Sequence, residues 1–280
     1  MAKKHKKKQK KFLKLWDVDS KNIEILESGK IKFKKDEKID ISSFAEDSVK
    51  DARISRLEGI PSKEEITIDG SATYRLNASA NCSSISRIVD LVGAIDTNEI
   101  QTIVVPVTKK KALSLEENDT IRWLAGSSTF LSVYSKLKKN WEALNDDDSS
   151  VFTNVLFIPK IYLFLEKKGK LRKTPITINL LIVALPTQNK AKSGLDDTDE
   201  YEYTSRIISD TVDAVIRCGC KSIIVDPYAM KALQEDVHYT ARYWYGKIET
   251  QRVIENVRSI TFSIDNDNLY VIFCKNKQSV

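Results

Sequence analysis

The sequence predicts an α/β protein whose mixed, largely parallel sheet is covered by helices. In the second half of the chain, strand-like runs alternate with helix-like segments, which is typical of strands joined by helical crossovers. The run QTIVVPV at 101–107 is continuously apolar, as expected for a strand buried on both faces of a sheet. No linker or internal repeat divides the chain, so these segments are expected to share one sheet.

The individual elements follow from the spacing of apolar residues and from turn residues. Apolar side chains recur at helical spacing through 129–144, and Ile208, Val212 and Val215 form one stripe in 203–217. The predicted strands are 22–27, 30–33, 65–68, 73–76, 101–107, 155–158, 161–166, 177–184, 221–226, 258–264 and 269–273. The predicted helices are 43–57, 83–92, 116–124, 129–144, 203–217, 231–245 and 249–256.

Length and composition favour a folded domain behind a charged tail. A chain of 280 residues with 41% hydrophobic and 30% charged residues can bury a large core. We expect a lysine-rich disordered tail at 1–20 and a single α/β domain over 21–276.

Several classes of function have little to be built from. No apolar run is long enough for a membrane helix, and no apolar segment follows the first lysines as in a secretion signal. We therefore expect an intracellular protein, cytoplasmic, or nuclear in a eukaryote. The four cysteines are scattered, and Cys218 and Cys220 are interpreted as small buried thiols. With only two histidines, no metal site, Ser-His-Asp site or cofactor is expected.

The N-terminal tail accounts for the net positive charge of the chain. The formal net charge is +6, and without the tail the rest of the chain is close to neutral. Such an arm is suited to nucleic acid or an acidic protein surface, serves as a nuclear address, or is merely a solubilising end. The candidate contact residues are Lys3, Lys4, Lys6, Lys7, Lys8, Lys10, Lys11 and Lys14.

Four stretches of sequence carry a resemblance to a known family. They are IVVPVTKKKALSLEENDTIRWLAGSSTFLSVY, FTNVLFIPKIYLFLEKKGKL, TINLLIVALP and SRIISDTVDAVIRCGCKSIIVDPYA, followed by RSITFSI. In order and type these elements resemble the microbial poly(ADP-ribose) glycohydrolases. The resemblance covers roughly 20–275 and implies a macrodomain-like three-layer sandwich with helices on both faces of the sheet.

The resemblance also implies roles for an acidic pair. Glu117 corresponds to the glutamate that protonates the departing ribose oxygen in the family, and Glu116 corresponds to its partner on the distal ribose. The glutamine that precedes the pair in the family is Leu115 here. Adjacent glutamates at the start of a helix also complement the helix dipole, so a purely structural role stays open.

The parts of the family that cradle the ligand are altered. The glycine-rich diphosphate loop is replaced by Lys109-Lys110-Lys111-Ala112, whose lysines supply charge but not close backbone approach. The ribose-binding asparagine at the strand end falls near Val105. In the second loop, at 226–230, Asp226 opposes a diphosphate and Pro227 lacks an N–H, while Tyr228 is a further ligand-contact candidate.

Three functions follow as hypotheses. The first is a degenerate macrodomain-like pseudoenzyme that binds a protein or nucleic-acid partner through the tail and the basic turn at 167–173. The second is a divergent enzyme that removes ADP-ribose from a macromolecule, with Glu117 as acid and Lys109–Lys111 offsetting the diphosphate charge. The third is an assembly role for an aromatic surface, unless those aromatic residues belong to the core. The aromatic residues concerned are Trp123, Trp141, Tyr243, Trp244 and Tyr245.

Overall fold

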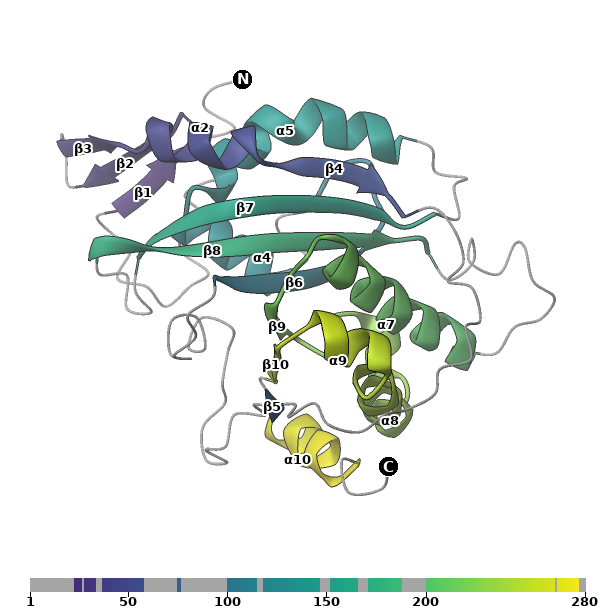
Figure 1. Ribbon diagram of the computed structural model, residues 1–280. Coiled ribbons are helices and arrows are strands. Elements are labelled where there is room, and N and C mark those ends of the chain that lie inside the picture. The colour runs from purple at the N-terminus through teal and green to yellow at the C-terminus, as the bar shows by residue number, and fades with distance from the viewer. Residues whose placement is uncertain are drawn as a thin grey trace.

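A mixed sheet with helices on both faces forms the centre of the molecule (Figure 1). The computed structural model describes residues 23–26, 28–33, 37–57, 75–76, 100–114, 118–146, 152–165, 171–187, 200–264 and 266–276. Among these residues, seven strands lie in the order β4, β7, β8, β6, β9, β10, β5. They are β4 (Arg53–Arg56), β5 (Arg75–Leu76), β6 (Gln101–Thr108), β7 (Asn154–Leu165), β8 (Leu171–Leu185), β9 (Ser222–Val225) and β10 (Ser259–Phe262).

Most neighbouring strands in this sheet are parallel. β6 is parallel to both β8 and β9, and β10 is parallel to both β9 and β5. Only β4 and β7 bring antiparallel pairing, at one end of the sheet. The prediction of a mixed, largely parallel sheet is therefore confirmed.

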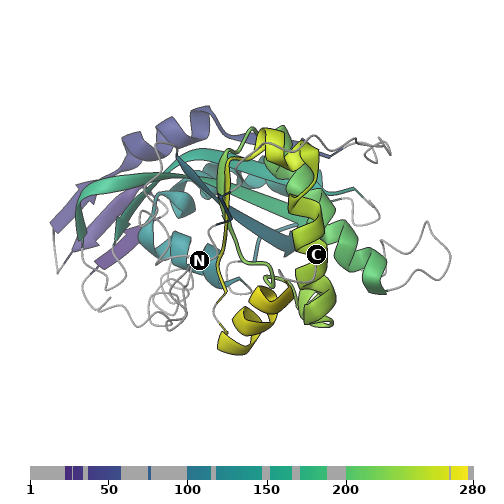
Figure 2. The same cartoon turned by 60° about the horizontal axis from the view of Figure 1, so that its bottom comes forward.

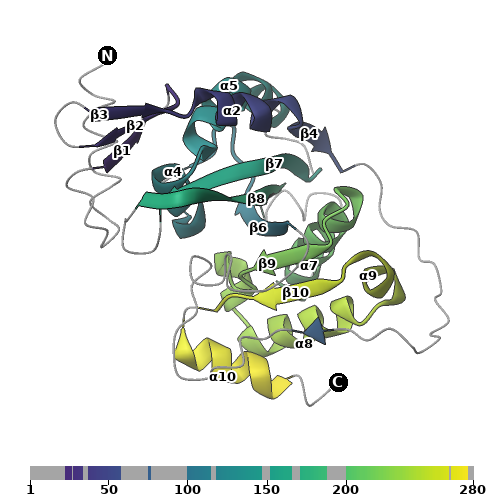
Figure 3. The ribbon, with the colours of Figure 1, turned by 60° about the vertical axis from the view of Figure 1, so that its left-hand side comes forward.

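Helices cover the two faces of the sheet as outer layers (Figure 3). On one face lie α2 (Ser42–Lys50), α4 (Asp119–Ser127) and α5 (Phe130–Asn145). On the other lie α7 (Glu200–Arg217), the short 3-10 helix η3 (Lys231–Gln234), α8 (Val237–Ile248) and α9 (Gln251–Asn256), with α10 (Asp267–Asn276) packed against α8. This is the three-layer sandwich that the sequence resemblance implies.

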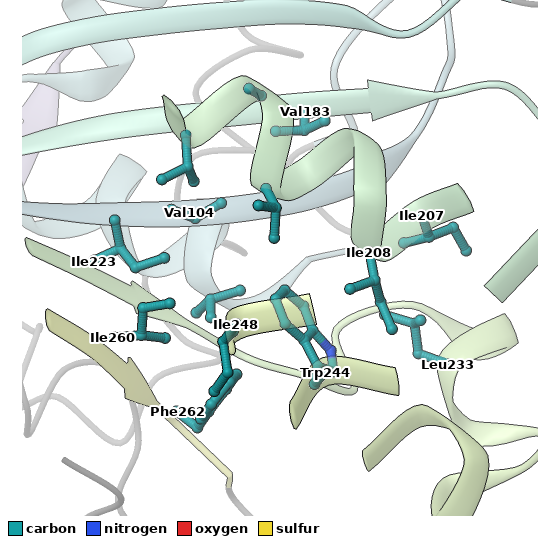
Figure 4. Close-up of a cluster of buried hydrophobic side chains, with 14 of the residues drawn as sticks. Val104, Val183, Ile207, Ile208, Ile223, Leu233, Trp244, Ile248, Ile260 and Phe262 are labelled. Carbon is teal, nitrogen blue, oxygen red and sulfur yellow. The ribbon is translucent and has the colours of Figure 1, made fainter. Parts of the chain in front are cut away.

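The central strand β6 contributes to both hydrophobic cores. Ile103 and Val105 pack under α4 and α5, while Val104 between them packs on the α7 and α8 side. Figure 4 shows the second core, in which Val104, Ile223 and Ile260 of three strands belong to the same buried cluster as Trp244 of α8. Because alternate side chains of one strand point to opposite faces, a strand covered on both faces needs the continuous apolar run seen at 101–107.

A small antiparallel sheet precedes the main one. It consists of β1 (Ile23–Leu26), β2 (Lys30–Phe33) and β3 (Glu37–Asp40). The first two confirm the strands predicted at 22–27 and 30–33, whereas β3, with charged residues at both ends, was not predicted. This sheet lies at one end of the molecule, far from α8 and α9 (Figure 2).

The last element corrects a sequence prediction. Residues 269–273 were predicted to be a strand, but they belong to helix α10. The Asn266 side chain caps this helix by accepting hydrogen bonds from the N–H groups of Asn268 and Leu269, at 2.9 and 3.2 Å. The buried Phe273 and the partly buried Leu269 and Tyr270 then form one helical face against the core.

Two predicted helices are shorter than expected. The segment 43–57 is helical only through α2, after which β4 pairs with β7, so long-range strand pairing overrides the local helical spacing. The segment 231–245 is split at Asp236, whose carboxylate accepts hydrogen bonds from the N–H groups of His238 and Tyr239 and starts α8.

The strands predicted at 155–158 and 161–166 are one strand, β7, with an irregularity in the middle. The register with β8 shifts between Ile158 and Ile161, and Lys160 has a positive φ of 58°. Pro159 has no N–H for the ladder, and such a residue is tolerated at a bulge. Downstream, β8 already begins at Leu171, so the end of the predicted basic turn 167–173 is strand rather than turn.

Some predictions lie outside the described residues. These are the tail at 1–20, the strand at 65–68, the helix at 83–92 and most of the basic turn at 167–173. Of the strand predicted at 73–76, only β5 is described.

Candidate functional site

A pocket of about 150 Å³ lies at the carboxyl ends of the central parallel strands. Open α/β sheets bind their ligands at this edge, outside the carboxyl ends of the strands. The binding site lies at the point where the strand order reverses. β6 lies at this point, with β8 on one side and β9 on the other. The lining residues are Pro106, Val107, Thr108, Lys110, Ala112, Leu113, Ser114, Asn118, Trp141, Ala184, Ala229, Met230 and Lys231.

The pocket brings together the two loops that the sequence matches to diphosphate loops. Residues 109–114 follow β6, and residues 226–231 follow β9. The chain separates them by more than a hundred residues, yet both contribute to one wall. The structure thus juxtaposes the two candidate loops, although only some of their predicted site residues line the pocket.

In the first loop, the three candidate lysines have different environments. Lys110 lines the pocket, whereas Lys109 is buried at 6% exposure and is not among the lining residues. Lys111 is exposed and forms an ion pair with Asp146 at the end of α5. The hydrogen bond to Asp146 and the negative charge of that carboxylate raise the pKa of the Lys111 ammonium group.

Two backbone donors of this first loop are used within the protein. The Lys109 N–H donates to the carbonyl of Leu185 at 2.6 Å, which extends the pairing of β6 with β8. The Leu113 N–H donates to the hydroxyl of Tyr134 at 3.0 Å. Neither group is available to an anion in this arrangement.

Two backbone donors of the second loop also donate within the protein. The Tyr228 N–H donates to the Asp226 carboxylate at 2.8 Å, and the Ala229 N–H donates to the Asp226 carbonyl at 3.3 Å. Trp244 donates through Nε1 to the carbonyl of Pro227 at 3.3 Å and so fixes the loop to α8. Asp226 therefore shapes the turn, with its carboxylate turned to its own backbone.

Tyr228 is part of the hydrophobic core. Its side chain is only 3% exposed, and its hydroxyl donates to the carbonyl of Val237 at 3.1 Å. Burial, with smaller contributions from nearby Tyr245 and Asp226, raises the pKa of this phenol. Neither Tyr228 nor Asp226 lines the pocket, and Lys231 is the charged residue of this loop that does.

The acidic pair, Glu116 and Glu117, lies outside the described residues. The residues on either side of the undescribed segment are informative, because Ser114 and Asn118 both line the pocket. Asn118 caps α4 through its side-chain oxygen, which accepts a hydrogen bond from the Ile121 N–H at 3.0 Å. α4 thus begins at the pocket, slightly later than the helix predicted at 116–124.

Four of the five candidate surface aromatics are core residues. Trp123, Trp141, Trp244 and Tyr245 are each 6% exposed or less, so of the two alternatives, surface or core, the core holds for them. Tyr243 is half-buried, and its hydroxyl lies 3.1 Å from that of Ser209. Val105, where the family has a polar residue, is buried among the side chains under α4 and α5.

Trp141 is the unexpected member of the site. It comes from α5, is 1% exposed and forms part of the pocket wall. Among the described residues, its buried Nε1 has no hydrogen-bond acceptor. The apolar spacing of 129–144 places Trp141 in the core, but nothing in that spacing indicates a pocket or an unpaired donor.

Other kinds of site are not found in the described part of the chain. No group of three or more His, Cys, Asp or Glu side chains there is arranged to hold a metal ion. No helix there is long and apolar enough to span a membrane. The tail lysines lie outside the described residues, so their predicted contacts stay a prediction.

The fold and the switch-point pocket define a macrodomain-like α/β protein. No protein-family model and no curated protein sequence matches the chain. Among solved structures, the poly(ADP-ribose) glycohydrolase of Thermomonospora curvata matches with a TM-score of 0.60 and 15% identity, over 90% of this chain and 95% of that chain. The same enzyme bound to the inhibitor ADP-HPD matches with a TM-score of 0.60 and 13% identity, over 90% and 94%.

A second bacterial enzyme extends the comparison. A variant of the Deinococcus radiodurans poly(ADP-ribose) glycohydrolase in complex with ADP-ribose matches with a TM-score of 0.51 and 14% identity, over 65% of this chain and 76% of that chain. At these identities the similarity concerns the fold. The chain therefore has the fold of the bacterial poly(ADP-ribose) glycohydrolases, as its sequence predicts.

Proposed function

We propose that this protein is a pseudoenzyme on the poly(ADP-ribose) glycohydrolase fold, which binds a macromolecular partner and does not hydrolyse ADP-ribose. The observation that carries the proposal is the internal use of the loop donors. The N–H groups of Lys109, Leu113, Tyr228 and Ala229 all donate to groups of the protein itself. A diphosphate is held by backbone donors that converge on it, so two loops that each use two of their N–H groups within the protein have fewer donors for that ligand.

The size of the pocket supports the same proposal. Pockets for drug-sized ligands are typically about 300–1,000 Å³, whereas the described residues here enclose about 150 Å³. Much of the rate of a glycosidase comes from holding the bond beside its acid, so weak positioning of the ligand removes that advantage.

The proposed partner is nucleic acid or an acidic protein surface that binds the N-terminal lysines. Eight lysines within fourteen residues can neutralise several phosphates and release their counterions. Such a contact supplies affinity without sequence specificity, so selectivity would come from the folded domain.

Calorimetry tests whether the protein binds ADP-ribose, and an assay of ADP-ribose release tests whether it is catalytic. We expect no measurable heat for the full chain at millimolar ADP-ribose, and no release of ADP-ribose from poly(ADP-ribose). A Glu116→Ala/Glu117→Ala variant should then behave like the unmodified protein. Micromolar binding, or hydrolysis that the double variant loses, would contradict the proposal.

Partner binding is tested with a fluorescein-labelled DNA duplex and fluorescence anisotropy. The full chain should bind with a slope of log K against log [salt] of about −0.9 for each neutralised phosphate. Replacing the eight tail lysines by glutamine should abolish this binding and leave the unfolding midpoint unchanged. Equal binding by that variant would exclude the tail as the contact.

A divergent ADP-ribose glycohydrolase is the second candidate. It is favoured by one observation, that Ser114 and Asn118 on both sides of the acidic pair line the pocket. In this case Glu117 would act as the general acid and Glu116 would orient the ribose. Glycohydrolase activity that falls by orders of magnitude in Glu117→Gln, with the fold retained, would establish this function in place of the first.

A further inference from the structure

We propose that helix α10 is an acid-sensitive strap on the second loop, residues 226–231, and that it opens at its carboxyl end when His238 takes up a proton. α10 packs along α8 (Figure 3). The latch of this strap is the contact between His238 of α8 and Asn276 of α10. The inference goes beyond the proposed function, because it concerns a conformational change that needs no ligand, partner or catalysis.

Phe273 connects α10 to the second loop. Its ring lies 6.0 Å from that of Tyr228, which belongs to the loop, and 4.9 Å from that of Tyr245 of α8, measured between centroids. The Tyr228 hydroxyl also donates to the carbonyl of Val237 at the start of α8. Tyr228 is therefore held by both α10 and α8, and the next three residues of the loop line the pocket.

The Asn276 amide defines the chemistry of the latch. The side chain is 8% exposed, and its Nδ2 lies 2.8 Å from the carbonyl oxygen of Ile272 and 3.1 Å from Nδ1 of His238. The Ile272 carbonyl can only accept a hydrogen bond, so it fixes the NH₂ group, and not the amide oxygen, on this side. The Asn276 amide thus donates to both neighbours. The contact requires a neutral His238 ring that accepts at Nδ1 and carries its hydrogen on Nε2.

Protonation of His238 removes the acceptor. A protonated imidazole is a donor at both ring nitrogens, so Nδ1 would then meet the Asn276 amide donor with a donor of its own. Turning the amide over does not restore the contact, because its oxygen would then face the Ile272 carbonyl oxygen. His238 is exposed to solvent, and imidazoles change charge between pH 5 and 8. The latch is therefore present at neutral pH and is lost as the pH falls.

The charges nearest to His238 along α8 and α10 oppose one another. Among the described residues they are Glu235 and Asp236, which favour a protonated ring, and Arg242 and Lys275, which disfavour it. The Asp236 carboxylate also accepts hydrogen bonds from the backbone N–H groups at the start of α8. None of these groups replaces the hydrogen bond between His238 and Asn276, so the state of the latch follows the proton on the ring.

Hydrogen exchange of the full chain, followed by mass spectrometry at pH 7.5 and pH 5.5, tests the proposal. The protection factors are corrected for the intrinsic effect of pH on amide exchange. At pH 5.5 they should be lower by about threefold to tenfold in α10 and in residues 226–231, because one hydrogen bond to a buried amide is lost. Protection in α5, on the other face of the sheet, should stay the same, which distinguishes local opening from a general loss of stability.

Three variants identify the group that responds to pH. His238→Ala removes the acceptor, so α10 should show the lower protection at both pH values. His238→Asn places a carboxamide oxygen near the position of Nδ1, and this oxygen accepts at either pH, so protection should be high and independent of pH. His5→Asn is the matched control, because His5 is the only other histidine of the chain, and it should keep the pH dependence of the unmodified protein.

Several results would overturn the inference. Equal protection of α10 at the two pH values in the unmodified protein would exclude the switch, and a change in α10 without one in residues 226–231 would exclude the strap. A pH dependence that persists in His238→Asn would assign the response to another group, such as Asp210 of α7, whose pKa is raised by burial. The samples contain neither DNA nor ADP-ribose, so this inference and the proposed function can fail independently.

Discussion

Burial controls the chemistry of the two cysteines beyond the end of α7. Cys220 is 3% exposed and Cys218 is half-buried, and desolvation raises the pKa of their thiols to about 12 and about 11. A smaller contribution from the hydrogen bond with Thr102 opposes the shift at Cys220. Both thiols therefore stay protonated in the folded protein at neutral pH, as expected for small buried cysteines.

We predict that Cys218 and Cys220 react slowly with iodoacetamide at pH 8 in the folded protein and rapidly in urea. Mass spectrometry of the labelled peptides distinguishes the two sites from Cys82 and Cys274. Rapid labelling of Cys220 without urea would show that its burial is incomplete.

The same pKa shifts predict the dependence of stability on pH. Unfolded thiols ionise from about pH 8.5, whereas the folded ones keep their protons until pH approaches about 11 to 12. Between these limits the unfolded state binds fewer protons, so the free energy of unfolding falls as pH rises. Urea titrations should show a decline above pH 8.5 that is smaller in a Cys218→Ala/Cys220→Ala variant.

At the scale of elements, Gly219 ends α7 in a conformation that glycine alone adopts easily. Its φ is +72°, and its N–H donates to the carbonyl of Ile216 at 3.0 Å. Gly219→Ala has space for the added carbon but places it in the left-handed region, so it should destabilise the protein by about 1–2 kcal/mol.

Gly246 is the matched control for this substitution. It lies within α8 without positive φ, and a Cβ there meets nothing within 4 Å. Gly246→Ala should stabilise the protein by up to about 1 kcal/mol, because alanine favours the helix interior. Urea unfolding of both variants measures the two effects, and equal changes would contradict the geometry of Gly219.

The helical nature of α10 can also be tested by substitution. Phe273 is 1% exposed and lies 4.6 Å from the ring of Phe262 and 4.9 Å from that of Tyr245, measured between centroids. Phe273→Ala should cost about 3–5 kcal/mol. Val271, on the same helix, is 47% exposed, and Val271→Ala should change stability by less than about 0.5 kcal/mol. Comparable losses at both positions would argue against the packing of α10.

At the scale of the whole molecule, the two cores share the strand β6. Ile103 belongs to the core under α4 and α5, and the adjacent Val104 belongs to the core under α7 and α8. We therefore propose that residues 21–276 unfold as one domain, because loss of β6 would remove buried side chains from both cores.

Thermal unfolding followed by tryptophan fluorescence, far-ultraviolet circular dichroism and calorimetry tests this proposal. The three transitions should coincide, and Ile103→Ala and Val104→Ala should lower the same midpoint. Two transitions, each sensitive to only one of these substitutions, would instead indicate two independent units.

The pocket also belongs to this largest scale. Sequence reasoning identified Lys110 through its loop, but Lys231, Ser114, Asn118 and Trp141 were not predicted as site residues. Nothing in the local sequence marks them as site residues. Asn118 is a helix cap, Trp141 is a core tryptophan, and Lys231 is a lysine that follows a strand. Only the parallel pairing of β6 with β8 and β9 brings the two loops, the start of α4 and part of α5 to one edge of the sheet.

The sequence by itself determined the α/β class, the buried strand at 101–107 and the helices at 129–144 and 203–217. These features depend on local periodicity and residue type, which a linear pattern records. The tertiary structure decided that 155–165 is one bulged strand, that 269–273 belong to helix α10, and that two N–H groups of each loop are already bonded. Those outcomes depend on which distant backbone groups and side chains meet, and no local pattern specifies such partners.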